Sequence, residues 1–208
     1  VLAIVALLFG SLFGWWALDP LMGIVGALVI TRWAWALLKE SSAILLDAGV
    51  EVLYHKEPQP DHADAIYVFD PAIVTDRGSV VLSMGKDLRL GEEAAIARTL
   101  EDLGVPIFAT LRGQATVEGG DLLWLDHDTL AVGRGYRTNA EGFRQLTATL
   151  RPLGVDTVEV QLPHGDGPEA CLHLMSVISM LDHDLAVVHL PLLPVPFIIT
   201  LRSIWSMT

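Results

Sequence analysis

The chain has 208 residues, of which 52% are hydrophobic and 18% charged, and its formal net charge is −12. Residues 61–208 carry −10 of this charge, with 10 basic and 20 acidic side chains, which argues against binding nucleic acid through its phosphates. The single cysteine, Cys171, excludes an intrachain disulfide and a cysteine-based zinc site, and it indicates a reducing compartment.

The first 38 residues are strongly apolar and contain only two charged side chains, Asp19 and Arg32. Residues 1–18 form an uncharged run of about the minimum length that spans a bilayer, and Asp19-Pro20 separates it from a second apolar run over residues 21–38. Tryptophans lie near the ends of both runs, and the cations follow the turn. This pattern predicts a two-helix transmembrane hairpin over residues 1–50, in contact with the membrane through residues 1–38. The alternatives are a signal peptide and a buried soluble hairpin.

Residues 18–48, LDPLMGIVGALVITRWAWALLKESSAILLDA, resemble the last two transmembrane helices of a cation diffusion facilitator, a divalent-metal/proton antiporter. In that family an His-x-x-x-Asp pair on the fifth helix holds the metal. The chain is expected to begin after this pair, so no family ligand corresponds to a residue here. The resemblance therefore implies a membrane topology rather than transport, with the part that follows a linker over residues 51–60 on the cytoplasmic side of the membrane.

From residue 61 the chain shows a weak internal repeat, marked by three acidic turns at residues 76–78, 126–128 and 182–184. Each turn lies between two short runs rich in Val, Leu and Ile, which is typical of a β-hairpin. Two hairpins are followed by helical patterns over residues 90–105 and 138–155, each ending in Leu-Gly-Val, and then by another apolar run. The helix faces are expected to carry Ile96, Leu100 and Leu103 in the first unit, and residues 143, 146 and 150 in the second.

These elements predict an α/β fold of repeated strand–strand–helix–strand units, used twice and started a third time. Periods near 50 residues indicate radial repetition, as in a propeller. The third unit is expected to lose its helix after Pro191, Pro194 and Pro196, which leaves residues 200–208 as an unmatched tail. We therefore expect an incomplete propeller over residues 61–199, which a partner chain would complete.

Polar residues recur where strands of the units begin: Asp70, Glu118, Asp121 and His173. In a ring these positions converge near the axis. Carboxylates bind a guanidinium in a planar, bidentate manner, and a histidine beside them can transfer protons near neutral pH. The paired glycines 119 and 120 would permit close approach to a ligand. Taken singly, each of these residues also fits a turn, a loop or a core position.

Four segments, FDPAIVTDRG, VEGGDLL, GRGYRTNAEGFRQL and CLHLMSVIS, resemble the pentein or guanidine-modifying superfamily. This superfamily includes arginine deiminase, dimethylarginine dimethylaminohydrolase and the amidinotransferases, on a five-bladed α/β propeller. The similarity extends from about residue 61 to residue 197, roughly three of five blades, so the fold it implies is a partial pentein-type α/β propeller preceded by the transmembrane hairpin.

The resemblance assigns roles to individual residues. Asp70 would bind the substrate guanidinium, and Glu118 would lie beside the catalytic His173, which protonates the leaving amine and activates water. Asp121 would support the site, and Arg137 would meet a substrate carboxylate. In the family mechanism a cysteine thiolate attacks the guanidinium carbon. The expected ligand is a small guanidine compound such as arginine or a methylarginine, with no cofactor and no metal.

Two features depart from the family pattern. Met175 stands two residues after His173, where deiminases have an aspartate, and this favours the dimethylarginine-hydrolase branch. The nucleophilic cysteine is expected beyond the last residue of this chain, and Cys171, on the same side of a strand as His173, is a weaker candidate. The sequence thus predicts an impaired guanidine hydrolase. The alternatives are a fragment of a cation-efflux protein and a non-catalytic arginine-binding module.

Overall fold

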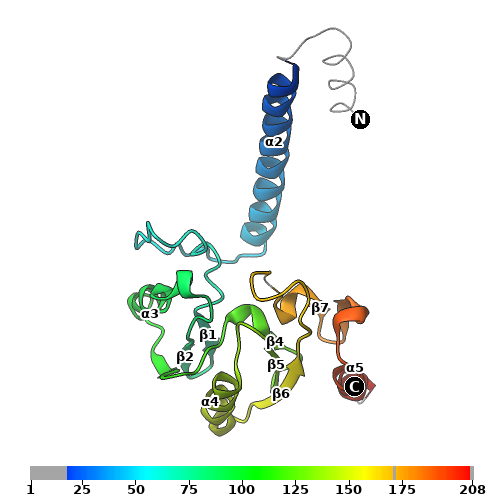
Figure 1. The fold of residues 1–208 in the computed structure, drawn as a ribbon. Helices are drawn as coiled ribbons and strands as arrows, with labels where there is room; N and C mark the ends of the chain where they lie inside the picture. Colours follow the sequence, from blue (N-terminus) through cyan, green and yellow to red (C-terminus); the bar gives the residue numbers. More distant parts are fainter. Residues whose placement is uncertain (1–17, 171, 207–208) are drawn as a thin grey trace. The chain divides into compact units, whose positions relative to one another are not determined.

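The structure, a computed structural model, describes residues 18–170 and 172–206 (Figure 1). The chain divides into two compact units, residues 1–54 and residues 55–208. The first unit contains the long helix α2 (Leu18–Asp47), and the second contains every strand of the described residues.

Helix α2 is 30 residues long and extends well beyond the predicted second helix over residues 21–38. Pro20 lies in its first turn, where proline is tolerated because the N–H that it lacks has no partner within the helix. Asp19-Pro20 therefore belongs to the start of α2. The first predicted helix, over residues 1–17, lies outside the described residues.

The predicted membrane location is wrong. Within residues 18–170 and 172–206, no helix combines the length and the apolar character needed to cross a bilayer. Although α2 is long, it contains five charged residues, and Arg32 lies within its most apolar stretch. Placing such a charge among lipid tails is costly.

The first repeat of the second unit contains a three-stranded sheet and one helix. Strands β1 (Ala72–Thr75) and β2 (Gly78–Val81) form an antiparallel hairpin, and β3 (Ile107–Thr110) adds to β2 in parallel. Helix α3 (Glu92–Asp102) connects β2 to β3 and contacts all three strands. The turn needs glycine at position 78, since φ is +126° and a Cβ there would lie 2.2 Å from the carbonyl oxygen of Pro106.

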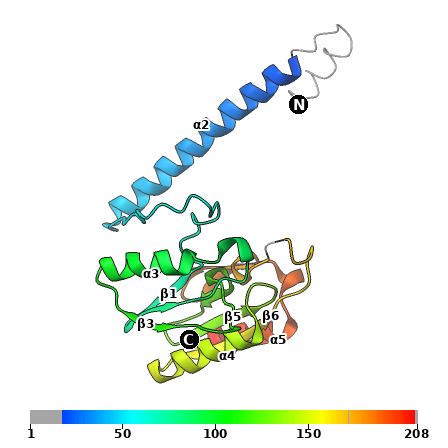
Figure 2. The same ribbon diagram turned by 60° about the vertical axis from the view of Figure 1, so that its left-hand side comes forward.

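The second repeat has the same order of elements. Strands β4 (Leu122–Trp124) and β5 (Thr129–Arg134) are antiparallel, helix α4 (Ala140–Leu150) follows, and β6 (Asp156–Gln161) pairs with β5 in parallel over six residues. Figure 2 shows α3 and α4 beside the strands of their own repeats. The two strand–strand–helix–strand units thus form as the apolar pattern predicts.

The third repeat differs from its prediction. Strands β7 (Ile178–Asp182) and β8 (Leu185–Val188) form a two-stranded antiparallel sheet, but helix α5 (Val195–Ser206) follows where a helix was not expected. Pro194 immediately precedes α5 and Pro196 is its second residue, so both prolines start the helix rather than prevent it. The described residues contain sheets of three, three and two strands and no closed ring, and a partner chain that completes one stays a prediction.

Two apolar clusters form the core of the second unit. The first lies between repeats 1 and 2 and includes Ile73, Val80 and Leu146, whereas the second lies between repeats 2 and 3 and includes Leu174 and Phe197. Strand β5 contributes to both clusters, since residues 130 and 132 face the first and residue 131 faces the second. Leu103, expected on the same helix face as Ile96 and Leu100, lies just beyond the end of α3 and is 45% exposed.

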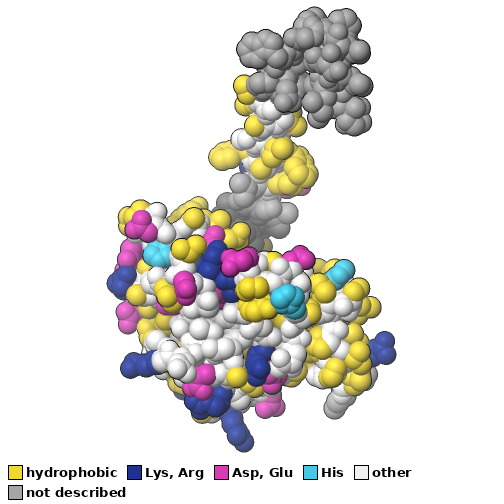
Figure 3. Space-filling view, viewed as in Figure 1, with side chains coloured by type: hydrophobic (Ala, Val, Ile, Leu, Met, Phe, Trp, Pro, Cys, Tyr) yellow, Lys and Arg dark blue, Asp and Glu magenta, His cyan; other side chains and the backbone are white. Residues whose placement is uncertain are grey.

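The surface of the second unit mixes residue types. In Figure 3 acidic and basic side chains are interspersed, and hydrophobic side chains gather on the right, where Figure 1 shows β7 and α5. Exposed apolar residues of these elements and their flanks are Leu181, Leu185, Val187, Val195 and Ile199.

Candidate active site

Asp70 lies two residues before β1 and is 8% exposed. Its Oδ1 accepts a hydrogen bond of 2.7 Å from the backbone N–H of Gly120, and its Oδ2 lies 2.5 Å from Nη1 of Arg89. The backbone carbonyl of Asp70 also accepts from the N–H of Gly119 over 2.9 Å. The start of the first repeat is therefore bonded directly to the Glu-Gly-Gly-Asp loop of the second.

Glu118 begins the Glu-Gly-Gly-Asp loop that leads into β4 and is 1% exposed. Its Oε1 accepts the backbone N–H groups of Gly85 and Lys86, at 2.9 Å and 3.0 Å. Its Oε2 lies 3.3 Å from Nε2 of His173. Because one carboxylate oxygen is occupied by the backbone, the other is held toward the histidine.

His173 lies just before the third repeat, and its ring is held between two carboxylates. Its Nδ1 is 3.1 Å from Oδ1 of Asp121, and the same oxygen accepts the backbone N–H of Leu174 over 3.1 Å. Asp121 is completely buried. Since a carboxylate oxygen accepts hydrogen bonds, Asp121 and Glu118 can accept from the two nitrogens of the ring, one on each side.

The same geometry sets the charge of Glu118. Burial alone would raise the pKa of this carboxyl group, but its hydrogen bond to His173, the charges of His173 and Arg137, and the Gly85 N–H outweigh that cost. The pKa of Glu118 is consequently lowered from its ordinary value of 4.5, and Glu118 is an anion at neutral pH.

The structure brings together three residues that are far apart in the sequence. One oxygen each from Asp70 and Glu118 and one ring nitrogen of His173 lie within 4.8 Å of one another. This spacing could hold a metal ion, and it also suits an organic cation such as a guanidinium. A pocket of about 490 Å³ opens beside them, lined by Asp70, Gly120, His173, Met175, Ser176 and residues 66–69.

Arg137 is buried beside this cluster rather than in the lining of the pocket. Its charge helps to lower the pKa of Glu118, and its Nε makes no hydrogen bond within the described residues. Cys171 is outside the described residues.

The two glycines of the loop were expected to let a ligand approach closely. The structure shows that the groups that approach them belong to the protein itself. A Cβ on Gly119 would lie 2.1 Å from the carbonyl oxygen of Phe69, and a Cβ on Gly120 would lie 2.8 Å from the ring of His173. The absence of side chains therefore lets Asp70 and His173 close around the loop.

Sequence reasoning missed two residues that hold Asp70 in place. Arg89 and Glu92 are both buried, and Nη2 of Arg89 lies 2.6 Å from Oε2 of Glu92 while Nη1 binds Asp70. Burial alone would lower the pKa of Arg89, but the two carboxylates raise it well above its ordinary value, so Arg89 remains a cation. The Arg-x-x-Glu spacing could have indicated the local pair, although its contact with Asp70 depends on the fold.

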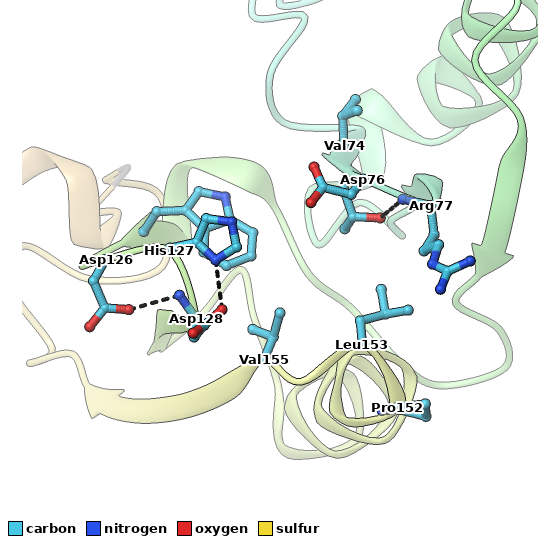
Figure 4. A pocket seen from close by; sticks show the side chains of 11 residues that line it. Val74, Asp76, Arg77, Asp126, His127, Asp128, Pro152, Leu153 and Val155 are labelled. Atoms are coloured by element: carbon cyan, nitrogen blue, oxygen red, sulfur yellow. Dashed lines mark hydrogen bonds and ion pairs between the residues drawn. The ribbon is translucent and has the colours of Figure 1, made fainter.

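A second pocket, of about 520 Å³, lies between the β1–β2 and β4–β5 turns (Figure 4). Its lining includes the polar residues Asp76, Arg77 and His127. Leu153 and Val155 form an apolar part of its wall. It contains none of the five predicted site residues.

Comparison with known proteins places this site in a family. The family model described as arginine deiminase matches residues 61–201. The chain belongs to the arginine deiminase family.

The similarity of this member of the arginine deiminase family extends to individual relatives. It is 33% identical to N(G),N(G)-dimethylarginine dimethylaminohydrolase of Streptomyces coelicolor, over 67% of this chain and 51% of the relative. It is 31% identical to the protein of that name from Pseudomonas aeruginosa, over 61% of this chain and 47% of the relative. The chain thus spans about half the length of the curated relatives that it matches.

Solved structures show the same fold. A dimethylarginine dimethylaminohydrolase adduct with 4-chloro-2-hydroxymethylpyridine superimposes with a TM-score of 0.62 and 28% identity, covering 74% of this chain and 60% of that one. The Pseudomonas aeruginosa enzyme, a cysteine-to-serine mutant complexed with citrulline, gives a TM-score of 0.55 and 29% identity. The match covers 63% of this chain and 49% of that one.

The prediction of a pentein-type α/β domain is therefore confirmed, and the domain is of the dimethylarginine dimethylaminohydrolase and arginine deiminase type. The family match covers residues 61–201. The resemblance of residues 1–50 to a cation diffusion facilitator, and the cation-efflux role that it would imply, stay predictions from the sequence.

Proposed function

We propose that residues 61–201 bind the guanidinium group of arginine or of a methylated arginine and supply the acid–base groups for its hydrolysis to citrulline. The observation that carries this proposal is the cluster of Asp70, Glu118 and His173, whose polar atoms lie within 4.8 Å of one another beside a pocket of about 490 Å³. The names of the relatives support the same class of substrate.

Binding would use the carboxylates of Asp70 and Glu118. Each carboxylate oxygen has two acceptor positions, so Asp70 can accept from a ligand while it stays bonded to Arg89 and Gly120. Glu118 is buried and anionic, and a charge-assisted hydrogen bond to a guanidinium is stronger in such a site than in water. The two carboxylates would fix the plane of the guanidinium group.

Hydrolysis adds water to the guanidinium carbon and breaks its bond to one nitrogen, which gives a ureido group and a protonated amine. His173 would donate its Nε2 proton to the departing nitrogen and then take a proton from the attacking water. The protons therefore balance over one turnover. In the family mechanism a thiolate makes the first attack, and Cys171 is the only cysteine of the chain.

Calorimetry on the intact 208-residue chain tests the binding step. Arginine and N-methylarginine should bind, whereas ornithine, which lacks the guanidinium, should not. Asp70→Asn and Glu118→Gln should each abolish binding, while Asp126→Asn, in the exposed β4–β5 turn, should leave it unchanged. Arginine binding that survives both site substitutions would contradict the proposal.

A citrulline-release assay with arginine and methylarginines tests the chemical step. His173→Asn should abolish turnover, and Cys171→Ser shows whether Cys171 supplies the thiolate. Weak turnover would agree with the predicted impairment, and binding without any turnover would favour the alternative of a non-catalytic arginine-binding module.

A further inference from the structure

Thr138 lies in the loop before α4, and its side chain is completely buried. Its hydroxyl donates a hydrogen bond of 2.6 Å to Oδ2 of Asp121. The same hydroxyl oxygen accepts the backbone N–H of Glu118 over 3.4 Å. One hydroxyl group therefore contacts both acidic residues that face the histidine.

Asp121 depends on this hydroxyl for the position of its second oxygen. Its Oδ1 accepts the backbone N–H of Leu174 and faces Nδ1 of His173, whereas its Oδ2 accepts from Thr138. A buried carboxylate oxygen that loses its donor carries a desolvation cost without compensation. The carboxylate would then rotate to find another donor, and this rotation disturbs its contact with His173.

The orientation of the imidazole follows from the same contacts. Asp121 faces Nδ1 and Glu118 faces Nε2. Both carboxylates can accept a proton from the ring, but the contact of Asp121 with Nδ1 is the shorter, 3.1 Å against 3.3 Å for Glu118 and Nε2, so we expect the neutral ring to keep its proton on Nδ1. Nε2 is then the nitrogen that exchanges protons beside Glu118.

We propose that Thr138 is a positioning residue for His173: by donating to Asp121, it fixes the carboxylate that holds the Nδ1 proton and the plane of the ring. The expected effect of Thr138 on kcat rests on the proposed hydrolase function. The expected effect on the tautomer of His173 does not. The role requires a hydroxyl donor, so serine can replace Thr138 and valine cannot.

The structural part is tested by ¹⁵N NMR of the His173 ring in the intact chain, at a pH at which the ring is neutral. Wild type and Thr138→Ser should show a single tautomer, protonated on Nδ1. Thr138→Val should show a mixture of tautomers. The matched control is Thr147→Val, which removes a hydroxyl bonded to Thr157 over 2.8 Å, outside the site, and it should retain the wild-type spectrum.

A kinetic measurement separates positioning from a general loss of stability. Thr138→Val should lower kcat for citrulline release about tenfold, with KM nearly unchanged. This loss is a part of the ~10²–10⁴-fold rate acceleration that a positioned acid–base group supplies. Thr138→Ser should restore kcat. Wild-type tautomer and kcat in Thr138→Val, or the same losses in Thr147→Val, would overturn the inference.

A second variant covers the case in which Thr138→Val does not fold. Asp121→Asn removes the anion that Thr138 holds, so it should give the same mixture of tautomers, and an unchanged His173 spectrum would overturn the inference. If the wild-type chain releases no citrulline, the proposed function fails, while the NMR experiment still decides the role of Thr138.

Discussion

The backbone N–H of Gly120 donates to Oδ1 of Asp70 over 2.7 Å, and this bond connects the first repeat to the second at the candidate site. Position 120 can form it only because it has no side chain: a Cβ there would lie 2.8 Å from the ring of His173 and 3.2 Å from Asp70 Oδ1. The loop and the two site residues therefore fit together only with glycine at this position.

Gly120→Ala should displace His173 or Asp70 and abolish arginine binding, with a loss of stability of about 1–3 kcal/mol, the usual cost of overpacking. The control is Gly135→Ala, whose Cβ would lie at an ordinary 3.4 Å from Leu162. Calorimetry and urea unfolding measure the two effects. Equal behaviour of the two variants would contradict the contact described here.

Glu92→Gln should destabilise the second unit by about 3–5 kcal/mol, since it leaves the buried guanidinium of Arg89 with only one carboxylate. Glu57→Gln, which breaks the exposed ion pair with Arg98, should cause no measurable change. Urea unfolding of both variants checks this difference. A Glu92→Gln protein as stable as wild type would show that the buried ion pair contributes little.

Glu118 should make the free energy of unfolding depend on pH in acid. Its pKa is lower in the folded chain than the ordinary 4.5, so its contribution is present above the ordinary value and is lost as the pH falls through the lower, folded value. Glu118→Gln should therefore flatten the decline of stability below about pH 4.5. Urea unfolding at a series of pH values tests this, and an undiminished acid decline in the variant would refute it.

Asn139→Ala should lower stability by about 1–2 kcal/mol, because Asn139 caps α4. Its Oδ1 accepts from the N–H groups of Gly142 and Thr116, over 2.7 Å and 3.2 Å, and its Nδ2 donates to the carbonyl of Gln114. Asn139→Asp retains the capping oxygen and should lower the stability less than Asn139→Ala. Thermal melting of the three proteins ranks them, and the order wild type, Asp, Ala is expected.

The repeat and the convergence of the site could be predicted from the sequence, because both depend on local patterns. Short apolar runs around acidic turns specify hairpins, and equivalent positions in successive repeats lie at the same end of the sheets. This brought Asp70, Glu118 and His173 together in the prediction as in the structure. The roles assigned to these residues remain proposals.

The remaining features depend on contacts that no local pattern contains. Nothing in the sequence distinguishes Arg89, near the start of α3, from a surface arginine, and only the fold places it against Asp70. No sequence pattern singles out Thr138, because a hydroxyl has no characteristic spacing from its partner. Pro194 and Pro196 resemble helix breakers in the sequence, although proline at the start of a helix is favourable.

Strand β5 has one face in each apolar cluster of the second unit. Local opening of the first or the third repeat would thus remove packing contacts from β5, on which the other repeat also depends. We therefore expect the amides of β2, β5 and β7 to share a single protection free energy in hydrogen exchange. The pocket of about 490 Å³ is built on the segments that precede β1, β4 and β7, so its geometry would persist for as long as the three repeats stay packed together.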